Sequence, residues 1–238
     1  MTDQRQAALA DLAQRLSPEG PISLDLLNRA LIHPSYVQEH GGGTNQRLEF
    51  LGDAVVGLVM ANYLYQEYPG DDEGKLTQRR ATLVCEEALA KAAGRLGIGD
   101  LMLFGRGESA HGGASRASNL ADAMEAVCAA VYLSVGLDPL EDLLCRILAP
   151  ELKKVAAGYY GDYKTRLQEY VQSHHQGQIS YRLLESHGPD HDKHFKMEVW
   201  VDDECLGTGE GRSKKNAERA AAYEALVHFG LEAETDVL

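Results

Sequence analysis

The sequence has no excess of positive charge, no closely spaced pair of cysteines and no apolar run long enough to cross a membrane. Its formal net charge is -13, which argues against a broadly basic surface of the kind that binds nucleic acid. The four cysteines form no Cys-x-x-Cys pair, so we expect reduced thiols, mostly in apolar helical surroundings. The longest uncharged stretch, residues 54–66, is shorter than the roughly 20 residues of a membrane-spanning helix. Because the N-terminus also lacks a signal-peptide pattern, we expect a cytoplasmic protein with no membrane partner.

Acidic residues outnumber basic ones in every part of the chain. Residues 1–161 carry 14 Lys and Arg against 21 Asp and Glu, and residues 162–230 carry 9 against 12. Residues 231–238 carry 3 acidic residues and no basic one, which predicts a disordered, solvating tail. Any binding of nucleic acid must therefore come from a local arrangement of cations, and it is expected to weaken with salt.

Residues 45–53, Asn-Gln-Arg-Leu-Glu-Phe-Leu-Gly-Asp, open an apolar helix that carries two carboxylates. Glu49 and Asp53 are four residues apart, so both project from one face of the helix. The surrounding residues are apolar nearly all round, which predicts a central, buried helix. On the same stripe, Gly57 and Ala61 are small enough to predict a close approach by another backbone. Since unpaired buried carboxylates cost several kcal/mol each, the acidic pair requires a cation.

A second apolar helix, residues 120–131, carries Asp122 and Glu125 three residues apart on one face. One acidic pair could belong to a satisfied core network, but two such helices in one domain favour facing pairs that share a divalent metal ion. Four carboxylates without a histidine or thiolate form an all-oxygen site, which selects Mg²⁺ first and Mn²⁺ second over zinc or iron. The chemistry that such sites serve best is phosphoryl transfer or hydrolysis.

Between the two acidic helices, a further helical region is predicted from residue 71 to about residue 96. Its acidic first turn complements the helix dipole. We interpret Asp71 and Asp72 as part of a solvated turn and leave the role of Glu73 open.

Residues 104–118 are rich in glycine and small polar residues and predict a mobile surface loop. Glu108 and His111 within it have the spacing of a di-iron helix motif. The flanking glycines make a helix unfavourable there, so the loop interpretation is preferred over a metal site.

A small second domain follows a hinge of small and aromatic residues that ends at residue 161. Residues 162–173 predict an amphipathic helix. Its outward polar stripe consists of Thr165, Gln168, Glu169 and Gln172. Alternation with period two then predicts strands in residues 179–183, 195–201 and 205–209, and Ser213 caps a last helix. The order α-β-β-β-α predicts an antiparallel sheet covered by helices on one face.

Lys214 and Lys215 stand in the first turn of that last helix, where cations oppose the helix dipole. They could be ordinary surface lysines, but their place after a flexible, glycine-containing segment favours binding of phosphate together with the free amides of the helix. His191, in the loop between the first two strands, predicts by itself only a loop histidine.

These motifs together resemble bacterial ribonuclease III. Residues 45–53, residues 120–125 and the turn His33-Pro34-Ser35-Tyr36 resemble its catalytic domain. Gly188-Pro189-Asp190-His191 and residues 213–219 resemble its C-terminal double-stranded-RNA-binding domain. The resemblance covers nearly the whole chain and implies a multidomain protein. Its parts would be an all-α endonuclease domain (residues 1–152), a linker (153–161), a small α+β RNA-binding domain (162–230) and the acidic tail (231–238).

The resemblance also implies a homodimer that cleaves both strands of double-stranded RNA with Mg²⁺. It implies 5′-phosphate and 3′-hydroxyl ends with short 3′ overhangs, and a part in processing rRNA, mRNA and other structured RNAs. Carried over by position, the metal site consists of Glu49, Asp53, Asp122 and Glu125. Asp53 and Glu125 would lie closest to the chemistry.

RNA contacts follow from the same resemblance. The resemblance implies that Thr165, Gln168 and Glu169 contact one minor groove of the RNA. It implies that His191 contacts a neighbouring minor groove. Lys214 and Lys215 would sit on phosphates across the intervening major groove, which is recognition of shape rather than sequence. Glu73 matches a further acidic position that faces the site or the scissile strand.

One position departs from the family pattern, because Gln46 stands where the first motif usually has Glu. The change puts a supporting role in dimer contacts or substrate placement in doubt, while the four metal-site carboxylates are intact. Two other classes compete with the nuclease. A regulatory binder of duplex RNA would not need all four carboxylates, and a di-metal oxidoreductase would need Glu-x-x-His pairs on helices.

Overall fold

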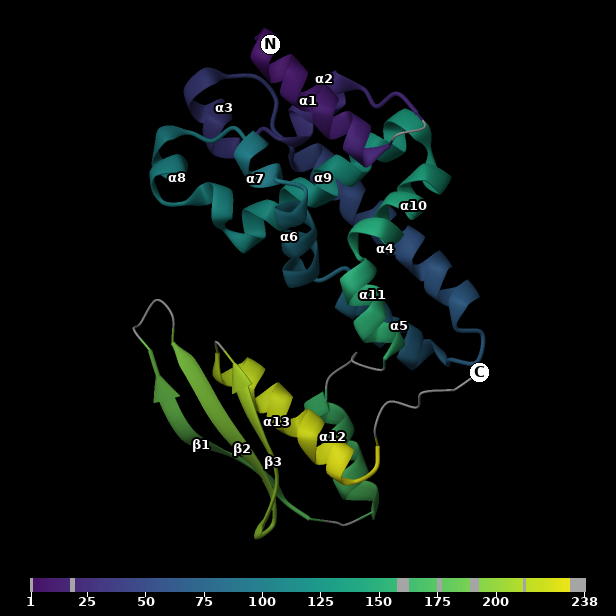
Figure 1. Ribbon diagram of the computed structural model, residues 1–238, viewed down its shortest axis with the longest axis vertical. Coiled ribbons are helices and arrows are strands. Elements are labelled where there is room, and N and C mark those ends of the chain that lie inside the picture. Colours follow the sequence, from purple (N-terminus) through teal and green to yellow (C-terminus); the bar gives the residue numbers. More distant parts are fainter. Residues whose placement is uncertain are drawn as a thin grey trace. The chain divides into compact units, whose positions relative to one another are not determined.

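The computed structural model describes residues 2–17, 20–157, 163–174, 177–188, 193–211 and 213–231. The chain divides into two compact units, Met1–Lys153 and Lys154–Leu238, shown as ribbons in Figure 1. Each unit makes most of its contacts within itself. The finer borders at residues 152, 161 and 230 stay predictions.

The regular elements that the structure describes in the first unit are all helices, joined by turns and one isolated β-bridge between Ile32 and Leu103. Its elements are α1 (Asp3–Leu16), α2 (Leu24–Ala30), α3 (Pro34–His40), α4 (Gln46–Glu67), α5 (Glu73–Leu83), α6 (Glu86–Arg95), α7 (Ile98–Leu101), α8 (Arg106–Ala110), the 3-10 turn η1 (Gly113–Ser115), α9 (Ala117–Val135) and α10 (Leu137–Ile147). A last helix, α11 (Ala149–Ala156), runs across the division between the units. The predicted helical region after residue 71 is thus two helices, α5 and α6, separated at Val84 and Cys85.

Side-chain caps explain where several helices begin. The Thr2 hydroxyl accepts the Arg5 amide at the start of α1, and the Ser23 hydroxyl accepts the Leu26 amide at the start of α2. Asp72 accepts the Lys75 amide at 2.8 Å and caps α5. Such caps satisfy amides that have no partner within the first helical turn.

Helices α4 and α9 form the central packed pair of the first unit. A Cβ atom added to Gly52 would lie 1.9 Å from the backbone oxygen of Glu125, so only glycine permits this contact. A Cβ added at Gly57 would meet nothing within 4 Å, so the close approach predicted there is not made by another described backbone segment of the same chain. The packing instead uses the glycine inside the acidic motif, where it brings Glu49 and Asp53 towards α9.

The two helices differ in how much of their surface is buried. Most of α9 is buried, including the run Ala126–Val131. The prediction that α4 is buried all round is wrong, because three large side chains of α4 are exposed: Phe50 (80%), Leu58 (58%) and Tyr65 (72%). In the part of the chain that the structure describes, α4 is also the one helix whose length and composition would fit a membrane span. A core helix passes the same test, and the other face of α4 packs on α9.

Residues 104–118, predicted as a mobile loop, contain α8 and η1. All four cysteines are free thiols, but only Cys128 is buried in the core. Cys85 and Cys205 are exposed, so the expectation of apolar surroundings is wrong for these two.

The second unit has the predicted α-β-β-β-α order, which confirms the fold class. Its elements are α12 (Tyr163–His174), β1 (Ile179–His187), β2 (His194–Val201), β3 (Glu204–Gly211) and α13 (Lys214–His228). The strands form an antiparallel sheet in the order β1-β2-β3, and both helices cover one face of it (Figure 1). Leu167, Val171 and Val199 are fully buried between the helices and the sheet. A Cβ at Gly209 would lie 2.2 Å from the Ala221 amide nitrogen, so α13 rests directly on the backbone of β3.

Candidate active site

The four predicted metal-site carboxylates lie where α4 and α9 pack together. Glu49 and Asp53 lie on either side of Gly52 on α4, and Gly52 contacts the backbone of Glu125 on α9. Asp122 lies one turn before Glu125. Glu49, Asp122 and Glu125 are partly buried, and Asp53 is exposed.

Electrostatics shows that the four acids act on one another. Burial, followed by the charges of Asp53, Asp122 and Glu49 in that order, raises the pKa of Glu125 to about 7. Burial and then Asp122 raise the pKa of Glu49. Burial and then Glu86 raise the pKa of Asp122, while His33 opposes them. A nearby cation would relieve the repulsion at all of these positions.

The side chains do not form a finished coordination shell. Over the described ranges, no group of three or more His, Cys, Asp or Glu side chains converges closely enough to hold a metal ion. The donor set nevertheless fits a hard divalent cation, because it is made of carboxylates alone and its charges repel one another. The metal site therefore stays a prediction about four coupled acids.

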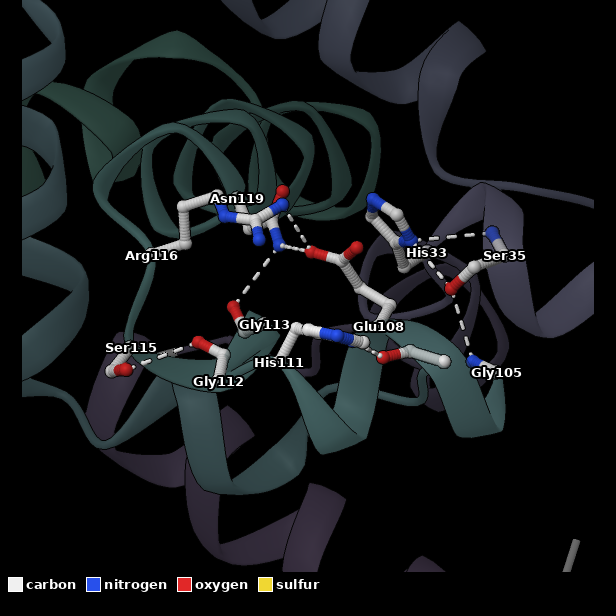
Figure 2. A network of polar contacts seen from close by, with 11 residues as sticks. His33, Ser35, Gly105, Glu108, His111, Gly112, Gly113, Ser115, Arg116 and Asn119 are labelled. Carbon is white, nitrogen blue, oxygen red and sulfur yellow. Dashed lines mark hydrogen bonds and ion pairs between the residues drawn. The ribbon is translucent and has the colours of Figure 1, made fainter.

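A polar network beside these acids was missed by sequence reasoning. The Glu108 carboxylate on α8 accepts hydrogen bonds from Asn119 at 2.9 Å and from Arg116 at 2.6 Å. The buried Asn119 amide also donates to the Gly113 backbone oxygen at 3.0 Å. Figure 2 shows this network, in which Glu108 ties α8 to the start of α9, and Asn119 ties α9 to the turn at Gly113. Glu108 is therefore held in an ordered contact. Its partner Asn119 lies on α9, three residues before Asp122.

Glu108 and His111 make hydrogen bonds to different partners. The His111 Nδ1 atom contacts the backbone oxygen of Gly107 at 2.7 Å, whereas Glu108 points to α9 (Figure 2). Although Glu108 and His111 have the spacing of a di-iron motif, each takes part in a different local contact. The oxidoreductase alternative loses its candidate ligand pair.

The two possible supporting residues are exposed in first helical turns. The Gln46 side-chain oxygen accepts the Thr44 hydroxyl at 3.3 Å, and Glu73 accepts the Thr77 hydroxyl at 3.4 Å. These contacts are local and leave both side chains on the surface of the first unit.

The turn before α5 is more ordered than predicted. Asp71 forms an ion pair with the buried Arg79 at 2.5 Å, and the Arg79 guanidinium lies 3.8 Å from the centre of the Tyr68 ring. The solvated-turn interpretation is therefore wrong for Asp71. The sequence around Arg79 is polar, so hydrophobic periodicity did not indicate that this side chain is buried.

The predicted RNA-contacting residues of the second unit are exposed wherever the structure describes them. Thr165, Gln168 and Glu169 lie on the face of α12 opposite its buried residues, and Lys214 and Lys215 are exposed in the first turn of α13. The Ser213 hydroxyl accepts the Asn216 amide at 3.2 Å, so the predicted cap is present. His191 lies outside the described residues.

Comparison with known proteins assigns both units. A family described as Ribonuclease-III-like matches residues 23–152, and the double-stranded RNA binding motif matches residues 163–228. The fold and the acidic helix pair thus define a nuclease domain followed by a module that binds double-stranded RNA.

Relatives of known name extend this match over most of the chain. Ribonuclease 3 of Moorella thermoacetica is 50% identical over 86% of this chain and 88% of its own length. Ribonuclease 3 of Syntrophomonas wolfei is 45% identical over 95% of this chain and 97% of its own. A solved nuclease domain of ribonuclease III from Campylobacter jejuni, described with a region involved in dimer formation, has a TM-score of 0.54 and 37% identity, and it covers 59% of this chain and 95% of its own. The chain belongs to the ribonuclease III family, and it is an endoribonuclease of double-stranded RNA.

Proposed function

We propose that this ribonuclease hydrolyses both strands of duplex RNA in a Mg²⁺-dependent reaction. The products would carry 5′-phosphate and 3′-hydroxyl ends with short 3′ overhangs, and the substrates would include rRNA precursors, mRNA and other structured transcripts. The observation that carries this proposal is the electrostatic coupling of four carboxylates across the contact between α4 and α9. Because all four cysteines are free thiols, we place the activity in the cytoplasm.

The residues that would hold the metal are Glu49, Asp53, Asp122 and Glu125, with Mn²⁺ able to replace Mg²⁺. When bound, the metal supplies activation of water and stabilisation of the leaving oxygen. Glu125, whose pKa is raised to about 7, would be partly protonated near neutral pH without a cation, and a bound cation would favour its ionised form. Asp53, which is exposed, and Glu125 would then face the scissile phosphate.

The second unit would supply most of the affinity for RNA. Thr165, Gln168 and Glu169 on α12 would meet one minor groove, and His191 a neighbouring one. Lys214 and Lys215 would bind the phosphates between them. The exposure of the described members of this set supports the proposal, since a duplex could reach them without unfolding the unit.

A second copy of the chain is the proposed partner of α4. Phe50, Leu58 and Tyr65 are exposed, and Ala54 and Ala61 lie between them at the spacing of one helix face. Exposed apolar stripes of this kind mark protein contacts. Gln46, one turn before Phe50, would have a supporting role at such a dimer contact, and Glu73 one beside the substrate. We expect Gln46 to be compatible with activity because it keeps the size and hydrogen bonding of Glu.

The test is incubation of the purified protein with a plain RNA duplex, with and without Mg²⁺, and mapping of the ends on both strands. The proposal expects intact RNA without the ion, and paired, staggered cuts with 5′-phosphates once it is added. A non-cutting binder would retain the duplex intact at every Mg²⁺ concentration. That outcome would exclude the proposed hydrolysis while leaving the RNA-binding unit in place.

A further inference from the structure

One ion pair joins α12 and α13, the two helices that carry the described RNA-contact residues and lie side by side on one face of the sheet (Figure 1). The Lys164 Nζ atom on α12 lies 2.7 Å from the Glu218 Oε2 atom on α13. Lys164 directly precedes Thr165, the first of the proposed minor-groove contacts. Glu218 follows Lys214, the first of the proposed phosphate contacts, by one helical turn. The ion pair therefore connects the two parts of the proposed RNA-binding surface.

The surroundings of the pair hold the lysine in place. The side chains of Lys164 and Glu218 are 37% and 23% exposed, so both charges are partly withdrawn from water. The Lys164 Nζ atom also lies 4.5 Å from the centre of the Tyr181 ring, which packs against the core from β1. A fully exposed ion pair contributes little to stability, but an ammonium group over an aromatic ring is stabilised further. We therefore expect the Lys164 ammonium to stay at Glu218 instead of reaching out to the RNA.

Without Lys164, the Glu218 carboxylate would act on the phosphate-binding lysines. Lys214 and Lys215 precede Glu218 by four and three residues, and side chains at these spacings are neighbours on a helix surface. A carboxylate there attracts the same ammonium groups that are proposed to bind phosphate, and it repels the phosphate itself. The ion pair with Lys164 offsets this negative charge from α12.

We propose that Lys164 is a positioning residue for RNA binding, which holds the Glu218 carboxylate at α12 and so keeps Lys214 and Lys215 available for phosphate. Lys164 itself would not touch the RNA. The proposal rests on the proposed function, because it matters only if the two lysines of α13 bind phosphate. It differs from a direct RNA contact and from a purely stabilising ion pair in one consequence: removing the Glu218 charge should compensate for removing Lys164.

The test is a double-mutant cycle with Lys164→Met and Glu218→Gln in the full chain. Methionine keeps an unbranched stem without the charge, and glutamine keeps the size of glutamate. Binding of a plain RNA duplex is measured without Mg²⁺, so that cleavage does not interfere, over a range of salt concentrations. The matched controls are Lys196→Met and Glu210→Gln. They remove a second ion pair of the same unit, with an N–O distance of 3.2 Å, on the sheet face that alternates with the buried one.

We expect Lys164→Met to weaken RNA binding by about three- to tenfold and to lower the slope of log affinity against log salt concentration by about 1, since one phosphate contact is lost to Glu218. Glu218→Gln alone should bind RNA at least as tightly as the parent protein. The double variant should regain the parent's salt slope and its affinity to within about twofold. The control variants should change neither quantity.

Two results would overturn the proposal. If the double variant binds RNA as weakly as Lys164→Met, Lys164 touches the RNA itself. If Lys164→Met lowers the melting temperature and leaves the RNA affinity unchanged, the ion pair is purely structural.

Two further arms keep the test decisive. If Lys164→Met does not fold, Glu218→Gln decides by itself: binding at least as tight as the parent's supports the proposal, and weaker binding overturns it. Lys214→Ala combined with Lys215→Ala separates the levels of the account. If that variant keeps the parent's affinity and salt slope, the proposed phosphate contact fails. If it loses both while Lys164→Met is normal, only the positioning role fails.

Discussion

The two units present opposite kinds of functional surface. In the first, burial is the leading cause of the raised pKa values of Glu49, Asp122 and Glu125, so like charges are partly withdrawn from water. In the second, the described residues proposed to contact RNA are exposed and polar or cationic. A partly buried group of like charges is stabilised by a cation, whereas an exposed polar surface is accessible to a duplex. Catalysis and binding are therefore expected to be separable by mutation.

The largest expected effect is on cleavage by Asp53→Asn or Glu125→Gln. Each removes a charge from the proposed metal site, so we expect kcat to fall by about a thousandfold or more. RNA affinity in a filter-binding assay is expected to stay within about twofold, because it resides mainly in the other unit. Glu67→Gln, at the exposed end of α4, is the control and should cleave normally. Loss of RNA binding in the two site variants would mean that the division between the units is wrong.

Next in size is the effect of Gly52→Ala on stability. The added Cβ would lie 1.9 Å from the Glu125 backbone oxygen, which neither helix can avoid without shifting. We expect urea denaturation to show a loss of about 3 kcal/mol for the first unit. Gly57→Ala on the same helix meets nothing within 4 Å and should gain up to about 1 kcal/mol. Equal effects of the two changes would contradict the packing described for α4 and α9.

On the RNA-binding side, Lys214→Ala combined with Lys215→Ala is expected to weaken duplex binding about tenfold. The slope of log affinity against log salt concentration should fall by about 2, since two phosphate contacts are removed. Turnover at saturating RNA should not change. Lys91→Ala, which removes an exposed lysine of the first unit, serves as control. An unchanged salt slope would show that the lysines are ordinary surface residues.

A smaller effect concerns pH. Because the pKa of Glu125 is raised to about 7 in the folded protein, the folded state keeps a proton that the unfolded state releases. The resulting stabilisation is complete below about pH 4.5 and is lost as pH rises to about 7. The parent protein without metal should therefore lose on the order of 1–3 kcal/mol over this range relative to Glu125→Gln. Parallel stability curves for the two proteins would exclude the raised pKa.

The smallest expected effect is that of Gln46→Glu. Gln46 is exposed and contacts Thr44, so restoring a charge should change turnover by less than about tenfold. Steady-state kinetics on a duplex measures this directly. An increase of several orders of magnitude would show that the residue takes part in the chemistry.

The acidic pairs could be predicted because spacing in a helix determines which side chains share a face. Glu49 with Asp53, and Asp122 with Glu125, needed only the helical repeat and the apolar residues around them. The α-β-β-β-α order of the second unit followed from the change to alternation with period two. These features depend on local sequence, and the structure confirms the fold that they predict.

Features that depend on tertiary contacts could not be predicted. Exposure of Phe50 on α4 cannot be read from an apolar repeat, because periodicity does not say which apolar face has a partner within the chain. The glycines around Glu108 indicated a loop, and only the fold brings Glu108 to Asn119 and Arg116. The polar sequence around Arg79 likewise concealed its burial against Asp71.

The most direct test of the account is a crystal of the protein grown with Mn²⁺ and examined for anomalous scattering. We predict a peak between α4 and α9 with carboxylate oxygens from both helices within coordination distance, including Glu49 or Asp53 and Asp122 or Glu125. A peak bound by one helix alone, or no peak at a Mn²⁺ concentration that supports cleavage, would contradict the claim that the two acidic pairs share a metal.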